Sequence, residues 1–264
     1  MTVNEESNFT ASSVKVAQTI KSQALYYLGK NNWGNIIAGL FIMILPAIVL
    51  YMLFGAIILT AGLLDCPENI VNILGIALDS LYLPVIVFAS PLATGFLRMC
   101  YKICKEENTG LGDILYFYSG GRFGKCMSIN LNIIVRIIGH ILLIAIFPVF
   151  LALSYKMTGN IVLFYSSILF GVFGLIESFL YCTKYTVTLS VYFEDESIET
   201  DDILKLGRDF LNEKDKRKST RFLLITFSPL ILLCFFIVPI IFIVPYICVS
   251  LMNNGKWITS LYIK

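Results

Sequence analysis

Five long apolar runs constrain this chain more than any other feature of its sequence. A membrane-crossing helix needs about 20 predominantly apolar residues, because lipid offers no hydrogen-bond partner to an exposed backbone. The runs cover residues 35–64, 70–97, 127–155, 161–181 and 222–252. Their few ionisable residues are Asp79 in the second run, Arg136 and His140 in the third, and Glu177 in the fourth. Each run is long enough to form a transmembrane helix.

The composition agrees with an integral membrane protein. Hydrophobic residues make up 57% of the 264 residues and charged residues only 14%, against about 25% in a typical soluble domain. No run alternates polar and apolar residues as a barrel strand does. We therefore predict an all-α fold with one membrane domain over residues 1–264. It is a polytopic transmembrane helical bundle with five spans plus amphipathic cytoplasmic helices.

The distribution of positive charge predicts the orientation. Most of the 20 Lys and Arg residues fall in three polar segments, the arm 1–34 and the loops 98–126 and 182–221. Because Lys and Arg are enriched in cytoplasmic loops, we expect a multi-pass protein of the cell membrane with a cytoplasmic N-terminus. The start MTVNEESNFTASSVK is polar and acidic, so no cleavable signal peptide is expected.

The last apolar run leaves two topologies open. It contains Pro229, Pro239 and Pro245, and each proline removes one helical hydrogen bond. The run is either one tilted, kinked helix, which places the C-terminus outside, or two shorter helices that return it to the cytoplasm. The second alternative raises the number of spans to six.

Two segments outside the runs have the apolar spacing of amphipathic helices. The stripes are Val16, Ile20, Gln23 and Tyr27 in the arm, which we expect along the inner leaflet, and Ile203, Leu206 and Phe210 in the last loop. A basic run follows the second stripe, with Lys214, Lys216, Arg217 and Lys218. It is either a solvated cytoplasmic face or a contact for anionic lipid headgroups or a membrane protein partner.

Four ionisable residues at membrane depth are the candidate site residues, because such groups are costly in lipid. Asp79 and Arg136 both lie about 14 Å inside their spans, near the midplane. They can form a charge-assisted pair, which either fixes helix register or lines a polar pathway for an ion or solute. His140 follows Arg136 by one helical turn, as a proton relay or as a hydrogen-bond partner between helices.

Glu177 lies close to the inner boundary of the fourth span, about 24 Å from its outer end. Lys184 follows on the same helical face, where its side chain can reach the cytoplasmic headgroups. Glu177 then requires a partner, for which Arg136, Arg98 or water are candidates.

The order of several segments along the chain resembles a known family. These segments are IKSQALYYLGKNNWGNIIAGLFI, SPLATGFLRMC, LGDILYFYSGGRFGKCMSINL, ILKLGRDFLNEKDKRKSTRFLLITFSPLILL and IVPYICVSLM. The chain resembles, from about Lys15 to Met252, the uncharacterised bacterial integral-membrane proteins grouped as domain of unknown function nine-seven-five. The resemblance implies a bacterial inner-membrane protein. It implies no activity, substrate or catalytic residue.

The motifs of soluble and metal enzymes are missing, and the chain has one histidine. The sequence has no HExxH, GxSxG, Walker or GxGxxG motif, so we expect no enzyme, no cofactor and no metal. No nucleic-acid partner is expected either. Arg122 and Lys125, in the glycine-rich segment GDILYFYSGGRFGK, give a weak indication of a phosphate-binding loop.

Two functions remain for such a chain. The first is a component or accessory of small-solute or lipid transport, with a polar seam formed by the four intramembrane candidates. The alternative is a non-catalytic membrane scaffold, or envelope-associated protein, whose basic loops bind anionic lipid or a partner. A lipid-modifying enzyme is disfavoured because the sequence shows no set of nucleophile and base.

Overall fold

The computed structural model describes residues 3–30, 32–64, 66–182, 184–227, 229–230 and 237–261. Every regular element in this described part is helical, which confirms the all-α prediction. The α-helices are α1 (Val3–Gly29), α2 (Trp33–Leu63), α3 (Glu68–Cys104), α4 (Phe123–Thr158), α5 (Ile161–Cys182), α6 (Lys184–Glu194), α7 (Thr200–Asn212), α8 (Lys214–Ile225) and α10 (Ile237–Ser260). Two short 3-10 helices, η1 (Leu111–Asp113) and η2 (Tyr116–Tyr118), lie between α3 and α4.

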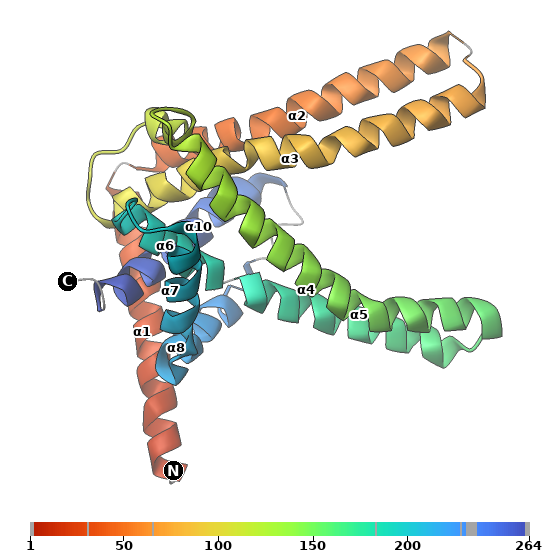
Figure 1. Cartoon of the computed structure of the whole chain (residues 1–264). Coiled ribbons are helices and arrows are strands. Elements are labelled where there is room, and N and C mark those ends of the chain that lie inside the picture. Colours follow the sequence, from red (N-terminus) through yellow and green to blue (C-terminus); the bar gives the residue numbers. More distant parts are fainter. Residues whose placement is uncertain are drawn as a thin grey trace. The chain divides into compact units, whose positions relative to one another are not determined.

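The chain divides into two compact units. The α2–α3 unit comprises residues 23–130 and 231–250, and the α5–α8 unit comprises residues 1–22, 131–230 and 251–264. Figure 1 shows α2 and α3 side by side in the first unit and α6 and α7 side by side in the second.

Three helices in the described part are long and apolar enough to cross a membrane. They are Trp33–Leu63, Phe123–Thr158 and Ile161–Ser178. They match three of the five predicted spans, and many of their large apolar side chains are exposed, including Leu143 at 73% and Phe173 at 70%. Such side chains are expected where a helix contacts lipid. The number of spans stays a prediction.

The predicted loop 98–126 is largely helical at both ends, because α3 continues to Cys104 and α4 begins at Phe123. The last turns of α3 are buried, with Met99, Cys100 and Cys104 fully inaccessible. Gly95 allows the chain between α3 and α4 to lie against α3, since a Cβ atom there would lie 2.8 Å from Ile114 Cα. Tertiary packing thus extends α3 beyond the predicted boundary.

A tight turn joins α4 and α5 into a hairpin. Gly159 has φ +69°, the left-handed conformation in which many helices end and which glycine adopts without strain. The Asn160 side-chain oxygen then accepts a hydrogen bond from the Val162 N–H (3.0 Å) and starts α5. Phe147 and Phe170 pack edge to face across the hairpin, with ring centroids 4.7 Å apart.

Small residues bring α6, α7 and α10 close together in the α5–α8 unit. A Cβ atom on Gly207 of α7 would lie 2.7 Å from Thr188 Cα of α6, and one on Gly255 of α10 would lie 2.8 Å from Ser190 Cβ. Around these contacts is a buried core of Val187, Val191, Phe210, Leu211 and Ile258. The predicted α7 stripe is confirmed for Ile203 and Phe210, which are buried, whereas Leu206 is half-buried.

The buried stripe of α1 differs from the predicted one. The buried residues are Ala17, Ile20, Ala24 and Leu28, whereas Gln23 is exposed and Val16 and Tyr27 are half-buried. Of the predicted stripe only Ile20 is buried. The observed set also has helical spacing, and the small alanines allow closer helix contact than tyrosine or glutamine does.

The predicted last span, residues 222–252, begins inside helix α8, and that helix ends soon afterwards. Helix α8 ends at Ile225, where the Thr226 N–H donates to Phe222 O (3.0 Å) and the Phe227 N–H donates to Leu224 O (2.9 Å). Pro229 lies after this turn. Pro245, by contrast, lies inside α10. Of Pro229 and Pro245, only Pro229 therefore lies near the end of a helix.

The C-terminal half of α10 is buried in the α5–α8 unit, where its asparagine side chains make polar contacts with other helices. The Asn253 amide donates to Ile20 O of α1 (3.2 Å), and the Asn254 amide donates to Thr220 Oγ1 of α8 (3.0 Å). Both asparagines are almost completely inaccessible. The C-terminal half of α10 therefore packs among α1, α6 and α8.

Candidate anion-binding site

A polar cavity of about 220 Å³ lies within the α5–α8 unit. We call it the arginine chamber. Its lining comes from four consecutive helices and consists of Arg136 of α4, Tyr181 of α5, Tyr185 and Thr188 of α6, and Leu204 and Arg208 of α7. Two guanidinium groups and three hydroxyl groups thus converge on one cavity.

Local sequence spacing explains how the chamber residues meet. Tyr181, Tyr185 and Thr188 follow one another at intervals of four and three residues, so they lie on one face across the α5–α6 junction. Tyr185 donates a long hydrogen bond to the Tyr181 hydroxyl (3.4 Å). Gly207 allows α7 to approach Thr188 closely, which places its neighbour Arg208 beside the α6 face.

The chamber carries two positive charges with no partner in the described part of the chain. Arg136 and Arg208 are both exposed, and neither makes a hydrogen bond or ion pair with another described residue. Guanidinium groups stay protonated throughout the physiological pH range. Two unneutralised guanidinium groups in one cavity attract an anion, and their planar forks fit phosphate or carboxylate oxygens.

His140 supports one wall of the chamber. Its ring stacks on the Tyr181 ring with centroids 3.7 Å apart and an interplanar angle of 8°. Its Nε2 atom is buried and makes no hydrogen bond with any described residue. The stack fixes the orientation of Tyr181. The structure therefore brings Arg136 and His140 to one place, whereas a proton-relay role stays a prediction.

Of the other two intramembrane candidates, Glu177 does not line the chamber. Glu177 is exposed and lines a second cavity of about 220 Å³ with Ile144, Phe147, Pro148, Phe170, Phe173 and Gly174. It makes no ion pair with any described residue. The side chains of Asp79 and Lys184 lie outside the described residues, so the Asp79 pair with Arg136 stays a prediction.

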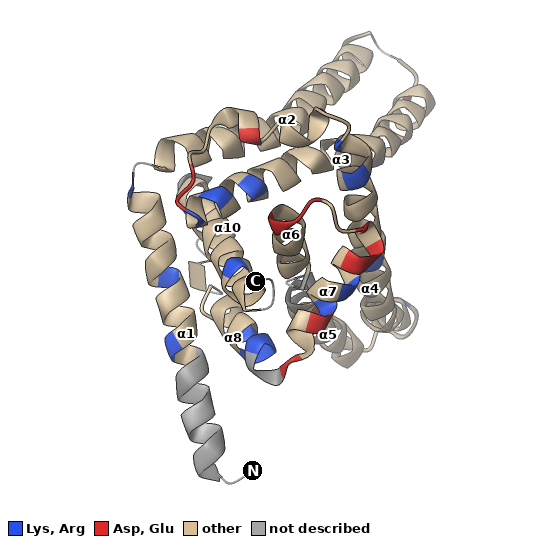
Figure 2. Cartoon of the chain, turned by 60° about the vertical axis from the view of Figure 1, so that its left-hand side comes forward, with Lys and Arg blue, Asp and Glu red and all other residues tan. Residues whose placement is uncertain are grey.

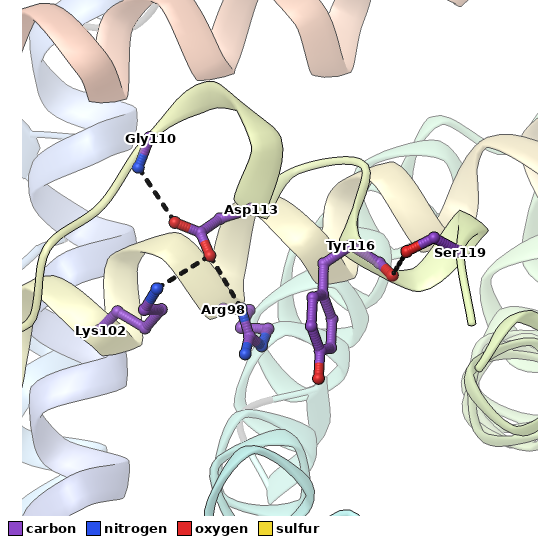
Figure 3. A network of polar contacts seen from close by, with 6 residues as sticks. All are labelled: Arg98, Lys102, Gly110, Asp113, Tyr116 and Ser119. Carbon is purple, nitrogen blue, oxygen red and sulfur yellow. Dashed lines mark hydrogen bonds and ion pairs between the residues drawn. The ribbon is translucent and has the colours of Figure 1, made fainter. Parts of the chain in front are cut away.

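A second polar network lies in the α2–α3 unit, where one carboxylate pairs with two cations (Figure 3). One oxygen of Asp113 accepts hydrogen bonds from Arg98 (2.8 Å) and Lys102 (3.0 Å), and its other oxygen accepts the Gly110 N–H (3.0 Å). The Arg98 guanidinium also lies 3.6 Å from the centroid of the Tyr116 ring. This network holds the segment after α3 against that helix.

The sequence reasoning missed Asp113. The available signal was the spacing of Arg98 and Lys102, which are four residues apart and therefore share a face of α3. In the predicted phosphate-binding loop, the Arg122 guanidinium lies 4.2 Å from the Tyr116 ring centroid, and Lys125 also has contacts within the protein. These cations are engaged in the loop, unlike Arg136 and Arg208.

The basic run on α8 divides into buried and exposed members. Lys216 is 8% exposed and forms an ion pair with Glu213 at 2.9 Å, and burial lowers the pKa of its ammonium group. Arg217 and Lys218 are exposed, and the side chain of Lys214 lies outside the described residues. Figure 2 shows basic residues on α8, α1 and α3 and acidic residues on α7.

No group of three or more His, Cys, Asp or Glu side chains within the described part could hold a metal ion. The chain matches no protein-family model, no curated protein and no solved structure. The expected membership in domain of unknown function nine-seven-five therefore stays a prediction. The arginine chamber is the candidate functional site on its geometry alone.

Proposed function

We propose that this protein is a polytopic membrane protein that binds an anion in the arginine chamber, as a component or accessory of small-solute or lipid transport. One observation supports this function above all. Arg136 and Arg208, which have no partner among the described residues, line one cavity together with three hydroxyl groups. Paired arginines of this kind bind phosphate or carboxylate groups strongly.

The position of the chamber favours entry of the anion at the membrane boundary. Tyr181 lies one residue before the end of α5, a helix with Glu177 as its single acidic or basic residue. The next helices, α6 and α7, form the loop 182–221 that the charge distribution predicts to be cytoplasmic. We therefore propose that the chamber opens at the inner leaflet, which puts Arg136 nearer that leaflet than the midplane depth expected from its position in the third run.

Binding of a phosphate group is the direct test. The probes are inorganic phosphate and dioctanoyl phosphatidic acid, with uncharged dioctanoyl glycerol as the control, added to the detergent-solubilised full-length protein. Both phosphate-bearing probes are expected to raise its unfolding temperature, since a ligand of the native state stabilises it. Arg136→Gln and Arg208→Gln are each expected to weaken binding about tenfold, because each substitution removes one charge-assisted hydrogen bond.

The control variant is Arg217→Gln, because Arg217 is also an exposed arginine but does not line the chamber. It is expected to bind both probes as the unaltered protein does. Equal responses of all three variants, or no response to either probe, would contradict an anion site in the chamber.

The alternative function, a membrane scaffold, is supported by the exposed Arg217 and Lys218 of α8. For that function the basic run, rather than the chamber, binds anionic lipid or a partner. Loss of phosphatidic acid binding in Arg217→Gln, with full binding in Arg136→Gln, would favour the scaffold.

We further propose that the last apolar run turns back and gives the protein a cytoplasmic C-terminus. The support is the packing of α10 against α1 and α8, since both are predicted to be cytoplasmic. A single crossing would place the end of α10 on the opposite side of the membrane from them. Six spans follow if all the other predicted runs cross.

Cysteine labelling in intact cells tests this topology, on a background without the seven native cysteines. Ser260 of α10 and Met157 near the α4–α5 turn are both exposed. We expect Met157→Cys to react with a membrane-impermeant thiol reagent and Ser260→Cys to react only after lysis. Labelling of both probes from outside would show instead that the chain ends outside.

A further inference from the structure

The arginine chamber and the apolar cavity beside Glu177 lie along one stripe of the α4–α5 hairpin. On α4 the stripe is Arg136, His140, Ile144 and Phe147, at intervals of four, four and three residues, so all four share a helix face. Arg136 lines the chamber and both Ile144 and Phe147 line the apolar cavity. With a rise of 1.5 Å per residue, the two cavities are about 12 to 17 Å apart along α4.

Helix α5 repeats this order from polar to apolar. Tyr181 lines the chamber, and Gly174, Phe173 and Phe170 line the apolar cavity. The stacked rings of His140 and Tyr181 lie between the two. Gly174 is buried against Ile144, where a Cβ atom would lie 2.5 Å from Ile144 Cγ2. The hairpin therefore has a cationic end and an apolar end, with the stacked rings between them.

An amphiphile matches this arrangement better than a soluble ion does. A soluble anion uses the chamber alone and leaves the apolar cavity without a role. An anionic lipid places its phosphate at the two arginines and its acyl chain against the phenylalanines of the hairpin. Within the membrane, the contact of an acyl chain with these residues is favoured by van der Waals packing in the cavity rather than by removal of apolar area from water.

Glu177 favours one orientation of the bound lipid. It lies on the rim of the apolar cavity, one helical turn before Tyr181 on α5. Its carboxylate repels a phosphate group from the apolar end, whereas the guanidinium groups attract it at the other end.

We propose that the ligand of the arginine chamber is an anionic phospholipid, with its headgroup at Arg136 and Arg208 and its acyl chain in the apolar cavity of α4 and α5. This inference rests on the proposed function, because it names the occupant of the same chamber. The phosphate chemistry is shared by free phosphate and by the lipid headgroup. The apolar cavity distinguishes the two sources.

The test measures affinities of the purified full-length protein in micelles for inorganic phosphate, dioctanoyl phosphatidylglycerol and dioctanoyl phosphatidylcholine. We expect phosphatidylglycerol to bind at least tenfold more tightly than phosphate and tenfold more tightly than the zwitterionic phosphatidylcholine. Phe173→Ser is expected to weaken phosphatidylglycerol binding about tenfold, because it removes the packing contacts of one large aromatic side chain with the acyl chain. Its phosphate affinity is expected to stay unchanged.

The matched control is Val172→Ser. Val172 and Phe173 are neighbours on α5 with exposed side chains, so neither change disturbs a core, and only Phe173 lines the cavity. Equal affinities for phosphate and phosphatidylglycerol, or equal effects of the two variants, would overturn the lipid assignment while phosphate binding upholds the anion site. If the unaltered protein bound neither phosphate nor phosphatidylglycerol, both the lipid assignment and the anion site would be overturned.

Discussion

Gly207→Ala is expected to lower the free energy of unfolding by about 3 kcal/mol or more, the upper end of the cost of overpacking. Alanine is the best helix former, so its helix propensity alone predicts a more stable α7. The tertiary contact reverses this sign, because a Cβ atom at position 207 would lie 2.7 Å from Thr188 Cα. The clash involves backbone, so α7 has to move away from α6 and open the core around Phe210 and Val191.

The same substitution at Gly139 is the control. Gly139 lies in α4, and a Cβ atom there meets nothing within 4 Å. Gly139→Ala is therefore expected to leave stability unchanged or to raise it by up to about 1 kcal/mol. The unfolding midpoint of the detergent-solubilised variants measures both effects. Similar midpoints for the two variants would show that α6 and α7 do not pack this closely.

Gly207→Ala should also weaken binding of phosphate-bearing probes. Thr188 and Arg208 line the chamber from the two helices that the substitution separates. At temperatures below its unfolding midpoint, the Gly207→Ala protein is therefore expected to be folded but not to bind these probes. Unchanged binding would indicate that the position of α7 is unimportant to the site.

Asp113→Asn is expected to lower the free energy of unfolding by about 2 kcal/mol. The substitution keeps the shape of the side chain but removes the negative charge that pairs with both Arg98 and Lys102. These groups are largely buried, with side-chain exposures of 12% for Asp113 and 18% for Arg98, so the screening that weakens surface ion pairs is reduced. Removing one partner from such a network leaves charges unpaired and costs more than a surface pair is worth.

Glu107→Gln is the matched control, because Glu107 is an exposed carboxylate in the same connection and has no ion pair within the described part of the chain. We expect its unfolding midpoint to equal that of the unaltered protein. Limited proteolysis between α3 and α4 should become faster in Asp113→Asn only. Equal proteolysis rates in the two variants would mean that the network does not hold this segment.

The chamber was only partly predictable. Arg136 and His140 stood out because ionisable groups in an apolar run are costly, and that physical cost does not depend on the fold. Tyr185, Thr188 and Arg208 gave no such signal, since hydroxyl and basic residues are ordinary in a polar loop. Their common position depends on Gly207, which lies next to Arg208 in sequence but acts through its contact with Thr188.

The helical class and the long apolar helices follow from the amino-acid sequence alone, because backbone hydrogen bonding in lipid leaves few alternatives to a helix. The amphipathic character of α7 also follows from the sequence, through apolar spacing. Which side chains meet depends on the tertiary packing: α1 packs through Ala17 and Ala24, Asp113 pairs with Arg98 and Lys102, and Arg136 shares a cavity with Arg208. Hydrophobic periodicity is local along the chain, whereas the approach of two helices depends on contacts between residues distant in sequence.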